Sequence, residues 1–112
     1  MEKLFDAFPD LLFELTKGLV GRQEIIDQLK DALIVDVTFD EDADAGCIKL
    51  QTGRQLNVVE QNIIGVKHGQ TLAVKCPYWV NLDTDNFERI ASIEILAPPA
   101  ALKAVLVARA RQ

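Results

Sequence analysis

The sequence predicts an α+β fold in three segments: an N-terminal helical hairpin over 1–33, a small antiparallel sheet of five to seven short strands over 34–97, and a C-terminal helix over 98–112. Apolar residues recur every three or four positions up to Leu33 and at alternate positions from Ile34 onward. The alternating runs are separated by two to five turn residues. Parallel pairing needs crossovers of a dozen residues or more, so we expect antiparallel strands. A chain of 112 residues, 49% hydrophobic, suffices for a single domain.

The first 33 residues are expected to form two helices joined by a short connection. One helical face collects Leu4, Phe5, Phe8, Leu11, Leu12, Leu15 and Leu19. Proline fits the first position of a helix, and glycine commonly follows the last. The main helix should therefore begin near Pro9 and end at Gly18, with 1–8 as a separate turn or arm. A second helix is expected from about Arg22 to Leu33.

Seven short runs predict the strands. In order they are Val35–Phe39, Cys47–Gln51, Leu56–Val58, Asn62–Val66, Leu72–Val74, Tyr78–Asp83 and Ile90–Leu96. In the first run, Val35, Val37 and Phe39 should share one face of the sheet. Pro98-Pro99 ends the sheet, because proline cannot donate to a strand ladder.

The C-terminal segment reads as a helix from Ala100 to Arg111 that carries three cations and no acids. Residues 1–46 hold 12 acidic and 4 basic side chains (−8), whereas 47–112 hold 5 and 8 (+3). Because the two halves attract each other, we expect this helix to dock on the acidic N-terminal helices of its own or a neighbouring chain.

The composition also excludes several classes of protein. A net charge of −5 argues against a general nucleic-acid binder, which needs a basic patch. No apolar run approaches the length of a membrane span, and no signal-peptide pattern opens the chain. Cys47 and Cys76 lack a CxxC pattern, so we expect two free thiols in a reducing cytoplasm; a disulfide between them is the alternative.

The acidic turn carries Asp40, Asp42 and Asp44 at alternate positions, as in a calcium loop. Such a loop needs glycine at its sixth position and glutamate at its twelfth, but the chain has Ala45 and Gln51 there. We favour a hairpin corner, and a divalent-cation site is the alternative.

His68 and Cys76 are the residues from which a thiol enzyme could be built, if they met across a hairpin. A nucleophilic cysteine needs a depressed pKa and an orienting group. The competing interpretation is a turn histidine and a small buried side chain.

Tyr78-Trp79 is the aromatic pair of the predicted sheet, and alternation sends the two rings to opposite faces. One ring could be an exposed anchor for a partner, although we favour an arrangement in which the chain's own helices cover both. The candidate interaction surface comprises Tyr78, Trp79, Leu102, Leu106 and Arg109.

Two motifs carry a family resemblance. The first is aromatic-Asp-x-x-Ala-Asp-Ala followed after two residues by Ile-x-Leu, present as Phe39, Asp40, Ala43, Asp44, Ala45, Ile48 and Leu50. The second is an acidic turn followed by Ile-Glu-Ile-Leu at 93–96. The region 35–96 thereby resembles a family of small bacterial proteins known as a domain of unknown function. Gly46 and Ser92 depart from that pattern, which has a bulky residue and a glycine there. The resemblance implies a small antiparallel sheet and a protein-binding or antitoxin-like role, without catalytic residues.

These observations favour a non-enzymatic protein-interaction or self-associating module that needs no cofactor. Its partner would be a second copy or another protein, not a membrane or a nucleic acid. The alternative is a divalent-cation or small-ligand binding module that uses the acidic turns, and a third hypothesis is an enzyme that uses Cys76 and His68.

Overall fold

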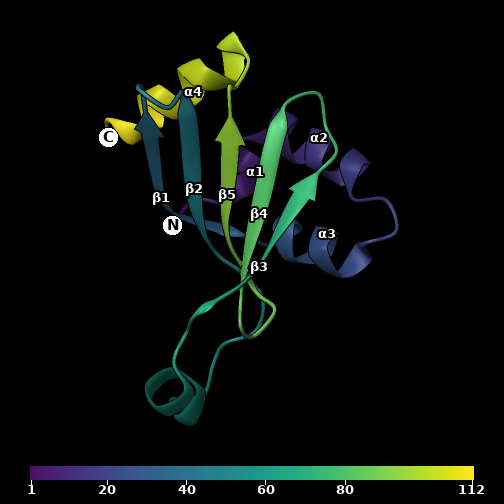
Figure 1. The fold of residues 1–112 in the computed structure, drawn as a ribbon, viewed down its shortest axis with the longest axis vertical. Coiled ribbons are helices and arrows are strands. Elements are labelled where there is room, and N and C mark those ends of the chain that lie inside the picture. Colours follow the sequence, from purple (N-terminus) through teal and green to yellow (C-terminus); the bar gives the residue numbers. More distant parts are fainter.

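A five-stranded antiparallel sheet, packed on one face against short helices, forms the body of the protein (Figure 1). The structure, a computed structural model, describes residues 1–112. The elements are α1 (Leu4–Ala7), α2 (Pro9–Gly18), α3 (Gln23–Lys30), β1 (Leu33–Asp40), β2 (Ala45–Gln51), the π-helical turn η1 (Glu60–Ile64), β3 (His68–Val74), β4 (Trp79–Asp85), β5 (Ile90–Leu96) and α4 (Ala100–Ala110). The α+β prediction is confirmed, with a strand count inside the predicted range.

The strands lie in the order β1-β2-β5-β4-β3, so β5 is central. Three of the four pairings are hairpins, and the fourth joins β2 to β5 across the intervening chain. One row across the sheet aligns Val37, Ile48, Ile93 and Leu82. All four side chains are buried, because alternate positions of each strand face the helices.

The main N-terminal helix forms where the sequence predicts it, with Pro9 in the first turn and Gly18 as the last residue. Gly18 has a second role, because a Cβ atom there would clash with the carbonyl oxygen of Lys75. The next helix ends at Lys30, earlier than predicted, because Leu33 already begins β1 and pairs with Lys3.

The predicted face of β1 is wrong at Val35. A β-bulge between Ile34 and Asp36 shifts the register, so Val35 is exposed while Val37 is buried. A bulge adds a residue to one strand, and alternation before it no longer matches alternation after it.

The predicted strands at Leu56–Val58 and Asn62–Val66 are also wrong, because residues 58–64 are helical. The apolar residues there come as two adjacent pairs, 58–59 and 63–64, separated by three polar residues. A spacing of four to five positions returns side chains to one side of a helix, whereas a half-buried strand needs a spacing of two.

α4 docks on its own chain, mainly against β1 of the first hairpin. Arg109 also reaches Glu2 and the Phe8 ring beside the N-terminal helices, so the predicted docking on those helices is correct only in part. Leu106 is fully buried above Gly46, where a Cβ atom would lie 2.7 Å from Leu106 Cδ1. Leu106 therefore fills the space that a side chain at position 46 would occupy. None of the helices combines the length and hydrophobicity that crossing a membrane requires.

Three ion pairs hold the basic helix against the acidic half of the chain. Arg109 donates to both carboxylate oxygens of Glu2 at 2.6 and 2.7 Å. Lys103 Nζ lies 3.2 Å from Asp44 Oδ1, and Arg111 lies 3.8 Å from Glu41. The charge asymmetry of the sequence is thus used within one chain.

Candidate interaction surfaces

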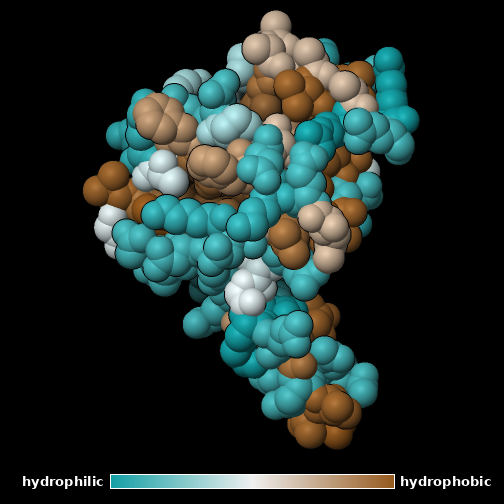
Figure 2. All heavy atoms as spheres, turned by 180° about the vertical axis from the view of Figure 1, so that it is seen from behind, coloured by the Kyte–Doolittle hydropathy of each residue, from teal (hydrophilic) through white to brown (hydrophobic).

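Residues 53–67, which we call the arm, leave the sheet after β2, project from the body and return at β3 (Figure 1). Leu56 is buried, but the other aliphatic side chains face solvent: Val58, Val59, Ile63, Ile64 and Val66 are exposed by 71, 52, 78, 49 and 55%. Figure 2 shows hydrophobic residues gathered at the tip of this projection, whereas Val66 lies at the base, where it lines a hollow with Val35 and Leu50. Exposed aliphatic residues gathered on a projection are typical of a protein-interaction site.

The arm is held in one conformation by its own polar groups. The Glu60 amide donates to Asn57 Oδ1 (2.9 Å), and the Asn57 amide donates to Glu60 Oε1 (3.1 Å). This reciprocal pair is a capping box, which satisfies the free amides at a helix start. Arg54 donates to both carboxylate oxygens of Glu60, and its hydrogen bonds lower the pKa of Glu60 to about 2. The tip is therefore ordered without any packing from the body.

The base of the arm is fixed to the β4–β5 turn. Asn86 exchanges hydrogen bonds with the backbone of Lys67, at 2.8 and 2.9 Å, and its side-chain amide donates to the Gly65 carbonyl. On the outgoing side, the Arg89 guanidinium donates to the Arg54 carbonyl. Thr52, buried at the root, donates to the Ile90 carbonyl at 2.6 Å. The arm thus leaves the body in a defined direction.

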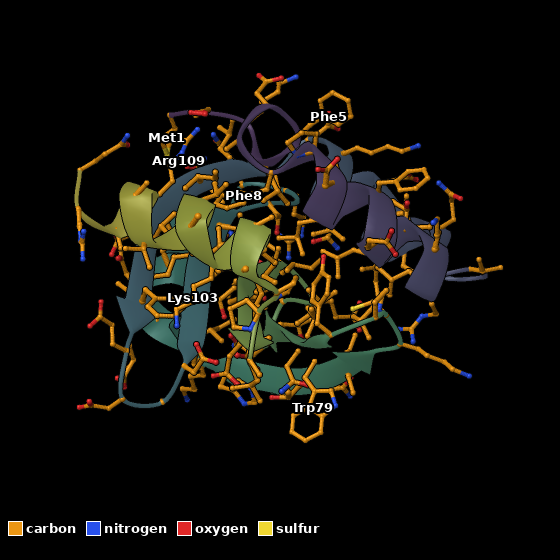
Figure 3. The ribbon with its side chains drawn as sticks, turned by 90° about the horizontal axis from the view of Figure 1, so that it is seen from above. Met1, Phe5, Phe8, Trp79, Lys103 and Arg109 are labelled. Carbon is orange, nitrogen blue, oxygen red and sulfur yellow. The ribbon has the colours of Figure 1, made fainter.

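The second surface is the face of the sheet that no helix covers. Trp79 points away from the helices on this face and is 74% exposed (Figure 3). The favoured expectation that both aromatic rings are covered is therefore wrong for Trp79, although Tyr78 is partly buried on the helical side. Trp79 pairs with Leu96, and Leu96 pairs with Ala45, so the row of Trp79 is apolar. The neighbouring rows of this face carry mostly polar residues, namely Thr38, Lys49, Thr71, Asn81, Asp83, Ser92 and Glu94. This face therefore presents one short apolar row in a polar surface.

The third surface is a groove between α2 and α4, which we call the α2–α4 groove. Its lining residues are Ala7, Phe8, Pro9, Asp10, Leu11, Glu14, Tyr78, Pro99, Ala101, Leu102 and Val105, around a volume of about 290 Å³. Two of the predicted surface residues, Tyr78 and Leu102, lie here. Burial first, and then the negative charges of Cys76, Glu14 and Asp10, raise the pKa of Tyr78 to about 12.

The other two predicted surface residues are already engaged. Leu106 is fully buried in the core and presents no surface. Arg109 is bound to Glu2, and its guanidinium also lies 6.0 Å from the centre of the Phe8 ring. Both residues fasten α4 to the body.

One carboxylate of the acidic turn, that of Asp40, stabilises the backbone of the hairpin. Asp40 Oδ1 accepts hydrogen bonds from the amides of Asp42 (3.0 Å) and Ala43 (3.2 Å). Asp44 has a φ of +51°, and its carbonyl accepts from the Ala97 amide. Aspartate tolerates this left-handed conformation better than most residues. The three aspartates do not converge on one point, and no group of metal-binding side chains forms elsewhere in the chain.

His68 is the first residue of β3 and Cys76 lies beyond its last, so the seven residues of the strand, which span roughly 20 Å, separate them. His68 Nε2 is 3.1 Å from Thr71 Oγ1, which donates to Asp83 Oδ1 at 2.6 Å. Cys76 donates instead to the Tyr78 carbonyl, and burial raises the pKa of its thiol. The two side chains are therefore far apart, and the pKa of the thiol is raised, whereas a nucleophilic cysteine needs a lowered one. Both cysteines are free.

Comparison with protein-family models, with curated proteins and with solved structures finds no match to this chain. The resemblance to the bacterial domain family, with its antitoxin-like implication, stays a prediction. The arm is the feature that sequence reasoning missed. Asn57 followed three residues later by Glu60 is a helix-start pattern that indicates a helical turn there.

Proposed function

We propose that this protein is a non-enzymatic interaction module that associates with a second copy of itself through the arm. The observation that carries the proposal is the set of five exposed aliphatic side chains on an ordered projection. We keep the reducing cytoplasmic setting, predicted from the two cysteines, as part of the proposal.

The exposed apolar surface is large enough to support weak association. The exposed fractions of the five side chains add up to about three fully exposed aliphatic side chains. Covering each contributes about 1.5–3 kcal/mol, so an arm gains about 5–9 kcal/mol. A symmetric pair of arms doubles this gain to about 10–18 kcal/mol, and association itself costs about 4–15 kcal/mol. With a cost in the middle of its range, the middle of the gain range leaves about 4 kcal/mol and the top leaves about 8 kcal/mol, so the expected Kd lies between about 1 mM and about 1 µM.

A second arm is the best-matched partner surface on the chain itself. The arm carries three charges, of which Arg54 and Glu60 neutralise each other and only Lys67 is left over. Interface centres are depleted in charged residues, and the tip matches this pattern. The two bodies are acidic and would repel each other at close range. Pairing at the tips keeps them apart, and salt screens charges that are more than about 10 Å from each other.

Sedimentation analysis from about 1 µM to about 1 mM tests the proposal across this range of affinities. The wild-type mass should rise from monomer to dimer. A double variant, Val58→Ser with Ile63→Ser, should stay monomeric at every concentration. Both residues are exposed, so circular dichroism should be unchanged.

Val20→Ser is the matched control, because Val20 is 84% exposed but lies in the α2–α3 connection, outside the arm. It should dimerise like the wild type. A wild-type chain that stays monomeric throughout, or arm variants that dimerise as well as the control, would contradict the proposal.

A further inference from the structure

The α2–α4 groove has an apolar floor and an acidic edge. Seven of its eleven lining residues are hydrophobic, and α4 contributes only Ala101, Leu102 and Val105. The charged side chains in the lining are Asp10 and Glu14, one turn apart on α2. Small-ligand sites have this composition, with an apolar wall and a few placed polar groups that fix orientation.

The nearby cations leave Asp10 without a partner and Glu14 with one. On α4, Lys103 is paired with Asp44, and Arg109 with Glu2. Lys17, which lies over the Phe13 ring, forms an exposed ion pair with Glu14 at 3.5 Å. Asp10 has no cation within 4 Å. Figure 3 shows Arg109 beside Phe8 and Lys103 on a different part of α4.

The volume of the groove sets the size of a ligand. At roughly 30 Å³ for each water-sized atom, about 290 Å³ holds about ten non-hydrogen atoms. This volume lies at the lower end of the range for ligand pockets. The groove lies between α2 and α4, so an alkyl chain can lie between the two helices.

The larger hollow of the protein, about 530 Å³ between α3 and the β3–β4 hairpin, does not select a ligand in this way. Its lining is mostly polar, and Gln28 there is already bonded to Thr52, Ile90 and Glu88. Its polar groups hold α3 to the sheet.

We propose that the α2–α4 groove binds an aliphatic cation, with an alkyl chain of about eight carbons on the apolar floor and an ammonium head beside Asp10 and Glu14. The length follows from the volume, and the sign of the head group follows from the two carboxylates. This site is independent of self-association through the arm, because no residue of the arm lines it.

Amide-resolved NMR titration with octylammonium tests the proposal, and octanol and octanoate serve as probes of the same length with neutral and negative heads. Octylammonium should shift the amides of α2, α4 and Tyr78, and should bind about tenfold more tightly than octanol. Octanoate should bind more weakly than either. An exposed ion pair contributes up to about fivefold in affinity, and two carboxylates act here.

The double variant Asp10→Asn with Glu14→Gln should reduce the preference for octylammonium over octanol to less than about twofold. Asp6→Asn, an exposed acid of α1 outside the groove, should keep the full preference. Equal binding of octylammonium and octanol to the wild type would overturn the proposal. So would shifts spread over the whole acidic surface, or a preference that survives in the double variant.

Discussion

Replacing Gly46 by alanine should destabilise the wild type but stabilise a chain that lacks the Leu106 side chain. In the wild type, the added Cβ would lie 2.7 Å from Leu106 Cδ1 and 3.2 Å from Cδ2. Carbon atoms pack best at about 3.5–4.0 Å, so α4 or Leu106 must move by about 1 Å. Leu106 is fully buried, and such overpacking costs about 1–3 kcal/mol.

The sign reverses once Leu106 is truncated. Leu106→Ala alone should cost about 2–5 kcal/mol, since it leaves a cavity under α4. In that background the new Cβ meets no methyl groups. Alanine also loses less backbone entropy on folding than glycine, which favours the variant by about 0.5–1 kcal/mol.

Urea denaturation of the four proteins of this double-mutant cycle measures the coupling between the two positions. We expect a coupling of about 1.5–4 kcal/mol, the sum of the cost in the wild type and the gain in the truncated background. Val105→Ala is the control, because Val105 is on α4 but is half-exposed and lines the groove instead. Its effect should add to that of Gly46→Ala within about 0.5 kcal/mol. A coupling between Gly46 and Leu106 below about 0.5 kcal/mol, as expected for the control, would refute the packing described for α4.

Three further perturbations test the arm, the open face and the root of the arm. The pKa of Glu60 is lowered from 4.5 to about 2, chiefly by Arg54. The ionised Glu60 therefore stabilises the helical turn fully above about pH 4.5, and this stabilisation is lost as the pH falls toward 2. Cα chemical shifts of 58–64 should report this loss, and Glu60→Gln should remove the pH dependence. Trp79 is the single tryptophan, so acrylamide should quench the fluorescence nearly as well as that of free indole, and a shielded indole in the monomer would contradict the exposed face. Thr52→Val should lower the free energy of unfolding by about 1–3 kcal/mol in urea denaturation, because the Ile90 carbonyl loses a buried donor, while Thr38→Val on the open face should change it by less than about 0.5 kcal/mol.

The parts of the fold that could be predicted are those where one local rule acts alone. Pro9 and Gly18 bound a helix because each has a strong positional preference. Alternation in the hairpin strands predicts which side chains are buried, as Ile48 and Ile93 are. At Val35 the same rule fails, because a bulge depends on the pairing with the neighbouring strand and leaves no local signal.

The candidate sites were less accessible to sequence reasoning, since they depend on which elements meet. The pairing of Leu106 with Gly46 could not be inferred without knowing that α4 crosses the first hairpin. The groove likewise needs α2 and α4 side by side. The arm was hidden for a different reason, because Val58 and Ile63 are β-branched and favour strands in isolation. Its helical turn depends on the local capping by Asn57 and Glu60.

The position of the arm within the β2–β3 connection has a consequence for how this chain can change. That connection spans residues 52–67, and the entropy of closing a loop grows only with the logarithm of its length. Halving its length would alter that entropy by only about 0.6 kcal/mol. The arm contributes no residue to the main hydrophobic core. Its length and its apolar tip can therefore vary between descendants of this sequence while the body keeps its stability, so that partner choice and folding are free to evolve separately.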